Sequence, residues 1–257
     1  MSARQNLFWD ALDSLFRLLT ELSVGKRLKS THLSFWMSDC KRYLRPNMIV
    51  VVDYGMSNVR SIVNKIERLK LRASVGRTPE DVLAADKLII PGVGHFAAGM
   101  KNLRSSGLLD ALELKVRREG APVLGICLGM QLLGTHSEEG DVEGLGWIDA
   151  RVRRFQLEGV QHSGSSRLRV PHVGWNTIEA RRPSILLDGQ SDEPRFYFVH
   201  SYHMDAAPES EAVVATTLYG YPFASIVQQG NIYGTQFHPE KSHHYGMRLL
   251  EQFLRCA

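Results

Sequence analysis

Short apolar runs alternate with segments of helical periodicity along the first part of the chain that follows residue 48. The runs at residues 49–52, 88–90 and 123–126 are continuously apolar, which is typical of strands that are buried on both faces of a parallel sheet. Apolar residues at three- and four-residue intervals predict helices within residues 59–69 and 108–118. This alternation indicates an α/β fold with a mostly parallel central sheet and helices on both faces.

The pattern changes after residue 148. Gly, Pro and Asn now separate short runs rich in β-branched and aromatic residues, which lie at 168–170, 196–199, 212–217, 225–228 and 232–236. Such runs predict antiparallel strands that extend the parallel core. Helical spacing returns at residues 247–254, so the chain is expected to close with a helix.

Residues 1–47 differ from the rest of the chain. Apolar residues at helical spacing near the start are followed by a basic, aromatic-rich tract without clear periodicity, and Met48 then opens the first strong strand. We expect residues 1–47 to be an N-terminal extension, poorly ordered or included by a start-site assignment, and residues 48–257 to form the globular domain. The alternative is an arm that binds a partner or a membrane surface.

The net charge of +4 comes from this extension, which holds eight Lys or Arg and four Asp or Glu. Residues 48–257 hold 23 basic and 23 acidic residues and are therefore balanced. A balanced domain gives no electrostatic reason to expect a nucleic-acid partner.

The cysteine count and the hydropathy also exclude several classes of protein. Three cysteines are too few for a disulfide framework, and their spacing matches no zinc site, so we expect neither a metal nor another cofactor. No run of 18 apolar residues predicts a membrane span. Together these features favour a protein of the reducing cytoplasm.

Candidate chemistry begins at residues 122–131, with the sequence PVLGICLGMQ. The segment predicts a buried strand, a tight turn at Cys127 and then a helix, with Gly125 and Gly129 on either side of the cysteine. This is the nucleophile-elbow pattern with Cys in place of Ser. The turn exposes the thiol at a helix N-terminus, where the dipole and the free N–H groups favour a thiolate and can bind an oxyanion.

A matching base lies near the end of the chain, at residues 232–241, with the sequence IYGTQFHPEK. His238 and Glu240 are two residues apart, so extended backbone directs both side chains the same way. Pro239 keeps His238 out of helical backbone. A carboxylate beside an imidazole is the orienting partner that a Cys–His pair requires.

Three glycines, together with the candidate cysteine and histidine, come just after predicted strands. Because ligands of open α/β sheets bind at the carboxyl ends of strands, one shared site is expected from Gly55, Gly92, Gly94, Cys127 and His238.

The PGVG segment at 91–94, the elbow and the distal FHPEK follow one another along the chain in an order that resembles the class I, or triad, glutamine amidotransferases, which have a flavodoxin-like fold. Among them, residues 48–257 resemble the glutaminase subunits of imidazole glycerol phosphate synthase. That narrower resemblance rests on five segments: DYGMSNVRS at 53–61, PGVGHF at 91–96, SEEG at 137–140, PHVGWN at 171–176 and FYFVHSY at 196–202.

The resemblance implies a Cys-His-Glu triad. Cys127 would attack the side-chain amide of glutamine, His238 would act first as base and then as acid toward ammonia, and Glu240 would orient His238. A γ-glutamyl thioester would form and be hydrolysed. The oxyanion hole would use the backbone N–H of Leu128.

The resemblance also places the second oxyanion donor on the segment Gly92, Val93 and Gly94, where glycine lets the peptide rotate. Gln131 would hold the substrate, and His200, Ser201 and Tyr202 would line the same pocket. If the oxyanion peptide is misoriented until the partner binds, the free subunit is weakly active.

The partner implied by the resemblance is a (β/α)₈-barrel cyclase subunit that conducts ammonia through its interior, in a heterodimer. Asn58, Trp175, Tyr197 and Lys241 match positions at that interface. Each also has an ordinary interpretation, as a core aromatic residue or a solvated polar one.

Three residues differ from those common in the family, without touching the triad: Ser57, Val173 and His203. These differences leave open an alternative function, that of a paralogous glutaminase that supplies ammonia to a surface-polysaccharide sugar amidotransferase. Two further hypotheses are a catalytically dead binding subunit and a cysteine peptidase on the same core.

Overall fold

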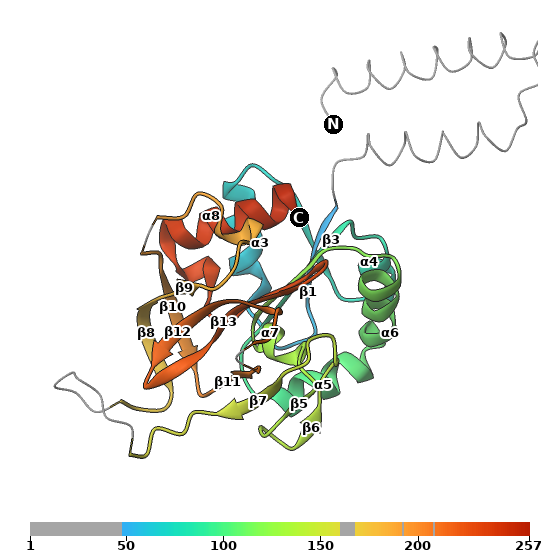
Figure 1. The fold of residues 1–257 in the computed structure, drawn as a ribbon. Coiled ribbons are helices and arrows are strands. Elements are labelled where there is room, and N and C mark those ends of the chain that lie inside the picture. The colour runs from blue at the N-terminus through green and yellow to red at the C-terminus, as the bar shows by residue number, and fades with distance from the viewer. Residues whose placement is uncertain (1–47, 160–167, 192, 208) are drawn as a thin grey trace, which may run out of the picture. The chain divides into compact units, whose positions relative to one another are not determined.

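The structure is a computed structural model of the chain, and it describes residues 48–159, 168–191, 193–207 and 209–257 (Figure 1). The predicted extension at residues 1–47 lies outside the described residues.

A single eight-stranded sheet forms the centre of the described domain, with strand order β2-β1-β3-β4-β14-β13-β12-β9. The first five strands in this order pair in parallel, and the last three continue the sheet through antiparallel pairs. The parallel part has the 2-1-3-4-5 order of flavodoxin-like folds, as predicted. In chain order the strands are β1 (Ile49–Val52), β2 (Ala73–Gly76), β3 (Lys87–Gly92), β4 (Val123–Cys127), β9 (Glu179–Ala180), β12 (Val213–Tyr219), β13 (Tyr221–Gln229) and β14 (Ile232–Thr235).

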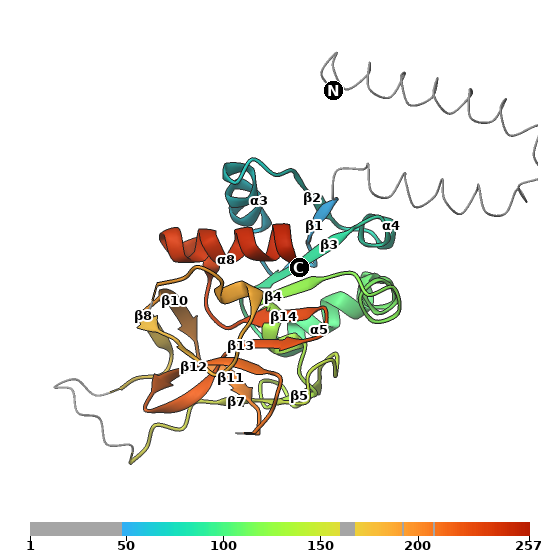
Figure 2. The ribbon, with the colours of Figure 1, turned by 45° about the horizontal axis from the view of Figure 1, so that its top comes forward.

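Helices cover both faces of this sheet, as Figures 1 and 2 show. One face carries α3 (Val59–Arg68) and the closing helix α8 (His243–Cys256). The other carries α4 (Pro79–Leu83), α5 (Phe96–Ser105), α6 (Leu108–Leu112) and its π-helical continuation η1 (Glu113–Arg118). No helix in the described part of the chain is long and apolar enough to cross a membrane.

Because helices cover both faces of the sheet, β1 is apolar along its whole length. Ile49 and Val51 belong to the core under α3 and α8, whereas Val50 and Val52 belong to the core on the other face. Because successive strand residues point to opposite faces, a strand buried on both sides must be apolar at every position. All four side chains are at most 1% exposed.

Beside the central sheet, which includes the predicted antiparallel strands β12 and β13, the described residues form two small sheets. In the first, β8 (His172–Thr177) pairs with β10 (Arg195–His200). The second has the order β11-β7-β5-β6. Its strands are β5 (His136–Ser137), β6 (Val142–Glu143), β7 (Arg151–Arg154) and β11 (Tyr202–Asp205).

Two details of the sequence prediction are wrong. Residues 168–170 are not a strand, because Pro171 lacks an N–H and both backbone groups of Arg169 bond to the Tyr219 hydroxyl. Residues 232–235 do form a strand, but β14 runs parallel to β4 and belongs to the core sheet. This pairing puts the ends of β4 and β14 side by side.

Helix α7 (Leu128–Leu132) packs unusually close to the sheet. A Cβ on Gly129 would collide with the Ile90 carbonyl oxygen of β3, and one on Gly125 would lie 2.6 Å from the Gly129 carbonyl oxygen. Only glycine allows the helix to turn back over its own strand at this distance.

We therefore expect Gly129→Ala to destabilise the domain by about 3 kcal/mol or more, because the helix must move away from β3. Urea unfolding measures the change. Gly99→Ala in α5 is the matched control, since its Cβ would meet only ordinary contacts of 3.4 Å or more. Gly99→Ala is expected to be neutral or to stabilise the domain by up to about 1 kcal/mol. Equal effects of the two substitutions would contradict this account of the α7 packing.

Candidate active site

Cys127 occupies the sharp turn between β4 and α7. Its φ of +53° lies in the left-handed region that non-glycine residues rarely adopt. The residue is 5% exposed and pairs across the sheet with Gly92 of β3. The structure thus has the strained strand–turn–helix geometry predicted from the sequence.

His238 and Glu240 lie together where β14 ends, beside the end of β4. Nδ1 of His238 and Oε1 of Glu240 are 2.8 Å apart, and both residues are buried. Nε2 of His238 has no hydrogen-bond partner among the described residues. One imidazole nitrogen is therefore held by the carboxylate, and the other is free to exchange a proton.

The electrostatics of this pair favour a charged imidazole. Burial alone would lower the pKa of His238, but the neighbouring Cys127 and the Glu240 carboxylate outweigh it and raise the pKa to about 10. Near neutral pH the histidine is therefore an imidazolium.

Strand β10 holds the histidine segment and reaches the cysteine. The backbone N–H of His238 donates to the Tyr197 carbonyl at 2.9 Å. The Ser242 hydroxyl accepts from the Tyr197 N–H and donates to the His238 carbonyl. Further along β10, the Val199 carbonyl oxygen lies 4.0 Å from the Cys127 sulfur. Cysteine and histidine are thus both in contact with one strand.

Gln131 and Tyr202, two of the predicted substrate-binding residues, are joined by a hydrogen bond. The Gln131 amide donates to the Tyr202 carbonyl at 2.8 Å and to the side-chain oxygen of Gln236 at 3.2 Å. Gln236 in turn directs its own amide nitrogen to the Cys127 sulfur, 3.8 Å away. Gln236 was missed in the sequence analysis, because its full burial beside Cys127 follows only from the fold.

The side chain of His200 points into an aromatic cluster beside the site. His200 and His172 are within hydrogen-bond distance of each other at 3.3 Å, and His200 Nδ1 bonds to the Tyr202 carbonyl. Phe155 packs against both rings. Ser201 contributes its carbonyl to the Phe155 N–H. The structure thus places the three predicted residues 200–202 together, with the His200 ring engaged inside the fold.

Burial keeps the imidazoles of this cluster neutral. It lowers the pKa of His172 to about 4 and that of His200 well below its usual range. The pKa of His203, whose ring packs against Phe155, is lowered for the same reason.

The predicted oxyanion segment, Gly92 to Gly94, begins at the last residue of β3, beside Cys127. Here the N–H of Val93 donates to the Met56 carbonyl at 2.7 Å and is therefore already bonded. Gly94 has a φ of +110°, and a Cβ there would lie 3.1 Å from the Met56 side chain. The loop after β1 thus holds this segment, a contact that the sequence analysis missed.

Three of the four predicted interface residues cluster on the β8–β10 pair. Trp175 and Tyr197 are direct register partners with rings 6.1 Å apart, and Lys241 Nζ lies 6.0 Å from the Tyr197 ring. Trp175 is 39% exposed and stacks on His243. Asn58 is exposed in the separate loop after β1, where its side chain caps α3.

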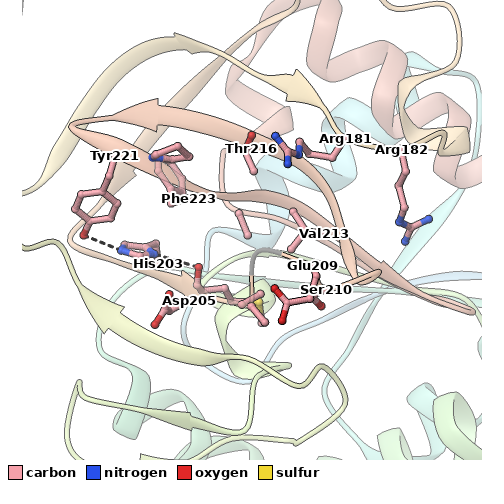
Figure 3. Close-up of a pocket in the computed structure, with 15 residues that line it drawn as sticks. Arg181, Arg182, His203, Asp205, Glu209, Ser210, Val213, Thr216, Tyr221 and Phe223 are labelled. Carbon is pink, nitrogen blue, oxygen red and sulfur yellow. Dashed lines mark hydrogen bonds between the residues drawn. The ribbon is translucent and has the colours of Figure 1, made fainter.

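A further pocket lies between β11 and the β12–β13 hairpin, lined by Arg181, Arg182, Asp205 and Glu209 among others (Figure 3). His203 borders it and bonds to the Tyr221 hydroxyl and the Met204 carbonyl. None of the predicted site residues lines this pocket. The described residues contain no group of three or more His, Cys, Asp or Glu that could hold a metal ion.

Comparison with known proteins agrees with this geometry. The profile of the family Glutamine amidotransferase class-I matches residues 50–256. The chain belongs to the class-I glutamine amidotransferase family. A solved glutamine amidotransferase has the same fold, with a TM-score of 0.61 at 24% identity, over 80% of this chain and 96% of that chain.

Within the family, the chain groups with the HisH subunits of imidazole glycerol phosphate synthase. It is 46% identical to HisH 2 of Methanococcus maripaludis over 210 residues, which are 82% of this chain and all of the relative. It is 43% identical to HisH 2 of Pseudomonas aeruginosa, with the same coverage. The narrower resemblance found in the sequence is thereby confirmed.

The neutral histidine cluster predicts sensitivity to acid. The unfolded chain protonates its histidines near pH 6.5, whereas the folded chain holds the pKa of His172 at about 4. Between these values the unfolded state binds more protons, so the free energy of unfolding falls as the pH falls. His238, whose pKa is raised to about 10, contributes a slope of the opposite sign from about pH 6 upward, but this contribution is the same in the wild type and in His172→Gln.

Urea unfolding at several pH values between about 5 and 6.5 measures this slope. We expect His172→Gln to reduce the slope by up to about 1.4 kcal/mol per pH unit, the contribution of one titrating group. At about pH 8 the three buried histidines are neutral in both states and contribute no slope, which serves as the control. An unchanged slope in His172→Gln would mean that this histidine titrates normally in the folded protein.

Proposed function

We propose that Cys127, His238 and Glu240 are the catalytic triad that hydrolyses the side-chain amide of glutamine. The observation that carries the proposal is the strained cysteine beside a histidine that Glu240 orients at 2.8 Å and whose second nitrogen is free. Membership of the class-I amidotransferase family supports the choice of substrate.

The geometry allows both halves of the reaction. The Cys127 thiolate attacks the amide carbon, and the His238 imidazolium donates its Nε2 proton to the departing nitrogen, so that the C–N bond breaks and ammonia leaves. The neutral imidazole then takes a proton from water, which attacks the thioester and releases glutamate. Glu240 holds the Nδ1 proton and stabilises the imidazolium.

The oxyanion formed in each half would be bound by the N–H groups of Leu128 and Val93. Leu128 follows the nucleophile and opens α7, where N–H groups have no intrahelical partner. The Val93 N–H is bonded to Met56 and must be turned toward the site, and the glycines at 92 and 94 permit that rotation. A free subunit with this peptide turned away is expected to be weakly active.

We further propose that the ammonia passes to a cyclase subunit of imidazole glycerol phosphate synthase in a heterodimer. HisH subunits at 46% and 43% identity support this partner and do not favour a sugar amidotransferase. The exposed Trp175 and Lys241, together with the half-buried Tyr197, form the proposed docking surface. Since the Tyr197 carbonyl bonds to the N–H of His238, docking would act directly on the catalytic histidine.

Substitution of the nucleophile tests the triad. With the cyclase subunit and its nucleotide ligand present, Cys127→Ala is expected to lower glutamine hydrolysis by at least about 1000-fold, measured as glutamate release. A diazoketone analogue of glutamine should label Cys127 in mass spectrometry. Cys256→Ala, which removes an exposed thiol, is the control and should change neither result. Activity that persists in Cys127→Ala would rule out the proposed nucleophile, and a failure to label would favour a catalytically dead binding subunit.

Trp175→Ala tests the docking surface. Because exposed tryptophans at interfaces contribute strongly to binding, we expect the affinity for the cyclase subunit to fall by about 30-fold in titration calorimetry. Leu114→Ala is the matched control, since Leu114 is also 39% exposed but lies on η1. If both variants bind like the wild type, the partner docks elsewhere.

A further inference from the structure

The Tyr54 hydroxyl is buried without a partner directly beside the oxyanion segment. Tyr54 is 4% exposed, and its Oη has no hydrogen-bond partner among the described residues. A Cβ on Gly92 would collide with this oxygen, so the hydroxyl lies against the Gly92 backbone. A buried hydroxyl without a hydrogen bond is costly, which suggests that it has a partner in another state of the protein.

The hydroxyl is kept in position and in its donor form. Asn102 of α5 donates to the Tyr54 carbonyl at 3.0 Å and fixes the loop after β1. Burial and the nearby Cys127 both raise the pKa of Tyr54, so the phenol stays protonated. A protonated phenol can donate one hydrogen bond.

Rotation of the Gly92–Val93 peptide would create an acceptor near this donor. In a planar trans peptide, the C=O and the N–H point in opposite directions. The Val93 N–H now points to the Met56 carbonyl, so the Gly92 carbonyl points away from it. When the N–H turns toward the substrate, the Gly92 carbonyl turns toward the loop that carries Tyr54 and Met56. The Met56 carbonyl cannot bond to it, because both are acceptors.

We propose that the Tyr54 hydroxyl donates a hydrogen bond to the Gly92 carbonyl in the catalytic conformation. Tyr54 is then a positioning residue that stabilises the rotated peptide, and through it the oxyanion hole. This inference rests on the proposed function, because it concerns the same glutaminase site.

The variant Tyr54→Phe removes this hydroxyl and keeps the ring. In the complex with the cyclase subunit and its nucleotide ligand, we expect kcat for glutamine hydrolysis to fall by about 3- to 10-fold, the effect of one neutral hydrogen bond. KM for glutamine should stay unchanged, and the melting temperature should not fall, since the resting fold loses only an unpaired hydroxyl. The γ-semialdehyde of glutamate, whose thiohemiacetal with Cys127 carries the oxyanion, should bind more weakly by the same factor.

Tyr233→Phe is the matched control. Tyr233 is also buried, at 7% exposed, but packs against Phe253 of α8 on the opposite face. It should leave kcat and semialdehyde binding unchanged. A Tyr54→Phe variant with wild-type kcat and semialdehyde affinity would overturn the proposal, as would a loss confined to KM or to stability.

A crystal structure of the wild-type complex with the semialdehyde provides a second test. We expect the Tyr54 Oη to lie about 2.5–3.0 Å from the Gly92 carbonyl oxygen. A Gly92 carbonyl that still points away from Tyr54 would overturn the proposal. Failure of the proposed function is a separate result: the wild-type complex itself would then hydrolyse no glutamine. The Tyr54 proposal fails instead when the wild-type complex is active and Tyr54→Phe behaves like it.

Discussion

The close approach of α7 to the central sheet determines the geometry of the whole site. Gly129 packs directly on the Ile90 carbonyl, and this contact forces the chain to reverse within one residue after β4. Cys127 takes the strain of that reversal, with a φ of +53°. Conformations of this kind cost about 1–3 kcal/mol and persist only when the surrounding packing determines them. Here the surrounding packing is tight, because every residue from Val123 to Gly134 is buried.

The second constraint is the pairing of β14 with β4, which brings together residues more than 100 positions apart in the chain. Because the two strands run in parallel, their carboxyl ends meet, and His238 arrives beside Cys127. Strand β10 then joins the base to the molecular surface through the bond between the Tyr197 carbonyl and the His238 N–H. The proposed triad is thus buried, yet one backbone hydrogen bond links it to the half-buried Tyr197, which packs beside the exposed Trp175.

Local spacing explains what could be predicted from the sequence. The glycines around Cys127 and the two-residue interval between His238 and Glu240 act within a few residues, so their geometry follows from a turn and a strand end. Tyr54 and Gln236 depend instead on strands and loops that meet only in the fold. Their buried hydroxyl and amide carry no periodic signal. The direction of β14 was missed for the same reason, since a short apolar run does not reveal its neighbour.

The site combines a charged pair with neutral surrounding histidines, and the difference lies in whether a partner offsets the cost of burial. Glu240 and Cys127 outweigh the cost of desolvating the His238 imidazolium, whereas His172 and His200 face mainly apolar rings and remain neutral. The free energies that would control the orientation of the Gly92–Val93 peptide are small. The bond from Val93 to Met56 contributes about 1 kcal/mol, and typical coupling between two binding sites is about 1–3 kcal/mol. In the proposed complex, a docked partner would therefore need to supply only a coupling energy of this size to turn the peptide from its resting orientation to the proposed catalytic one.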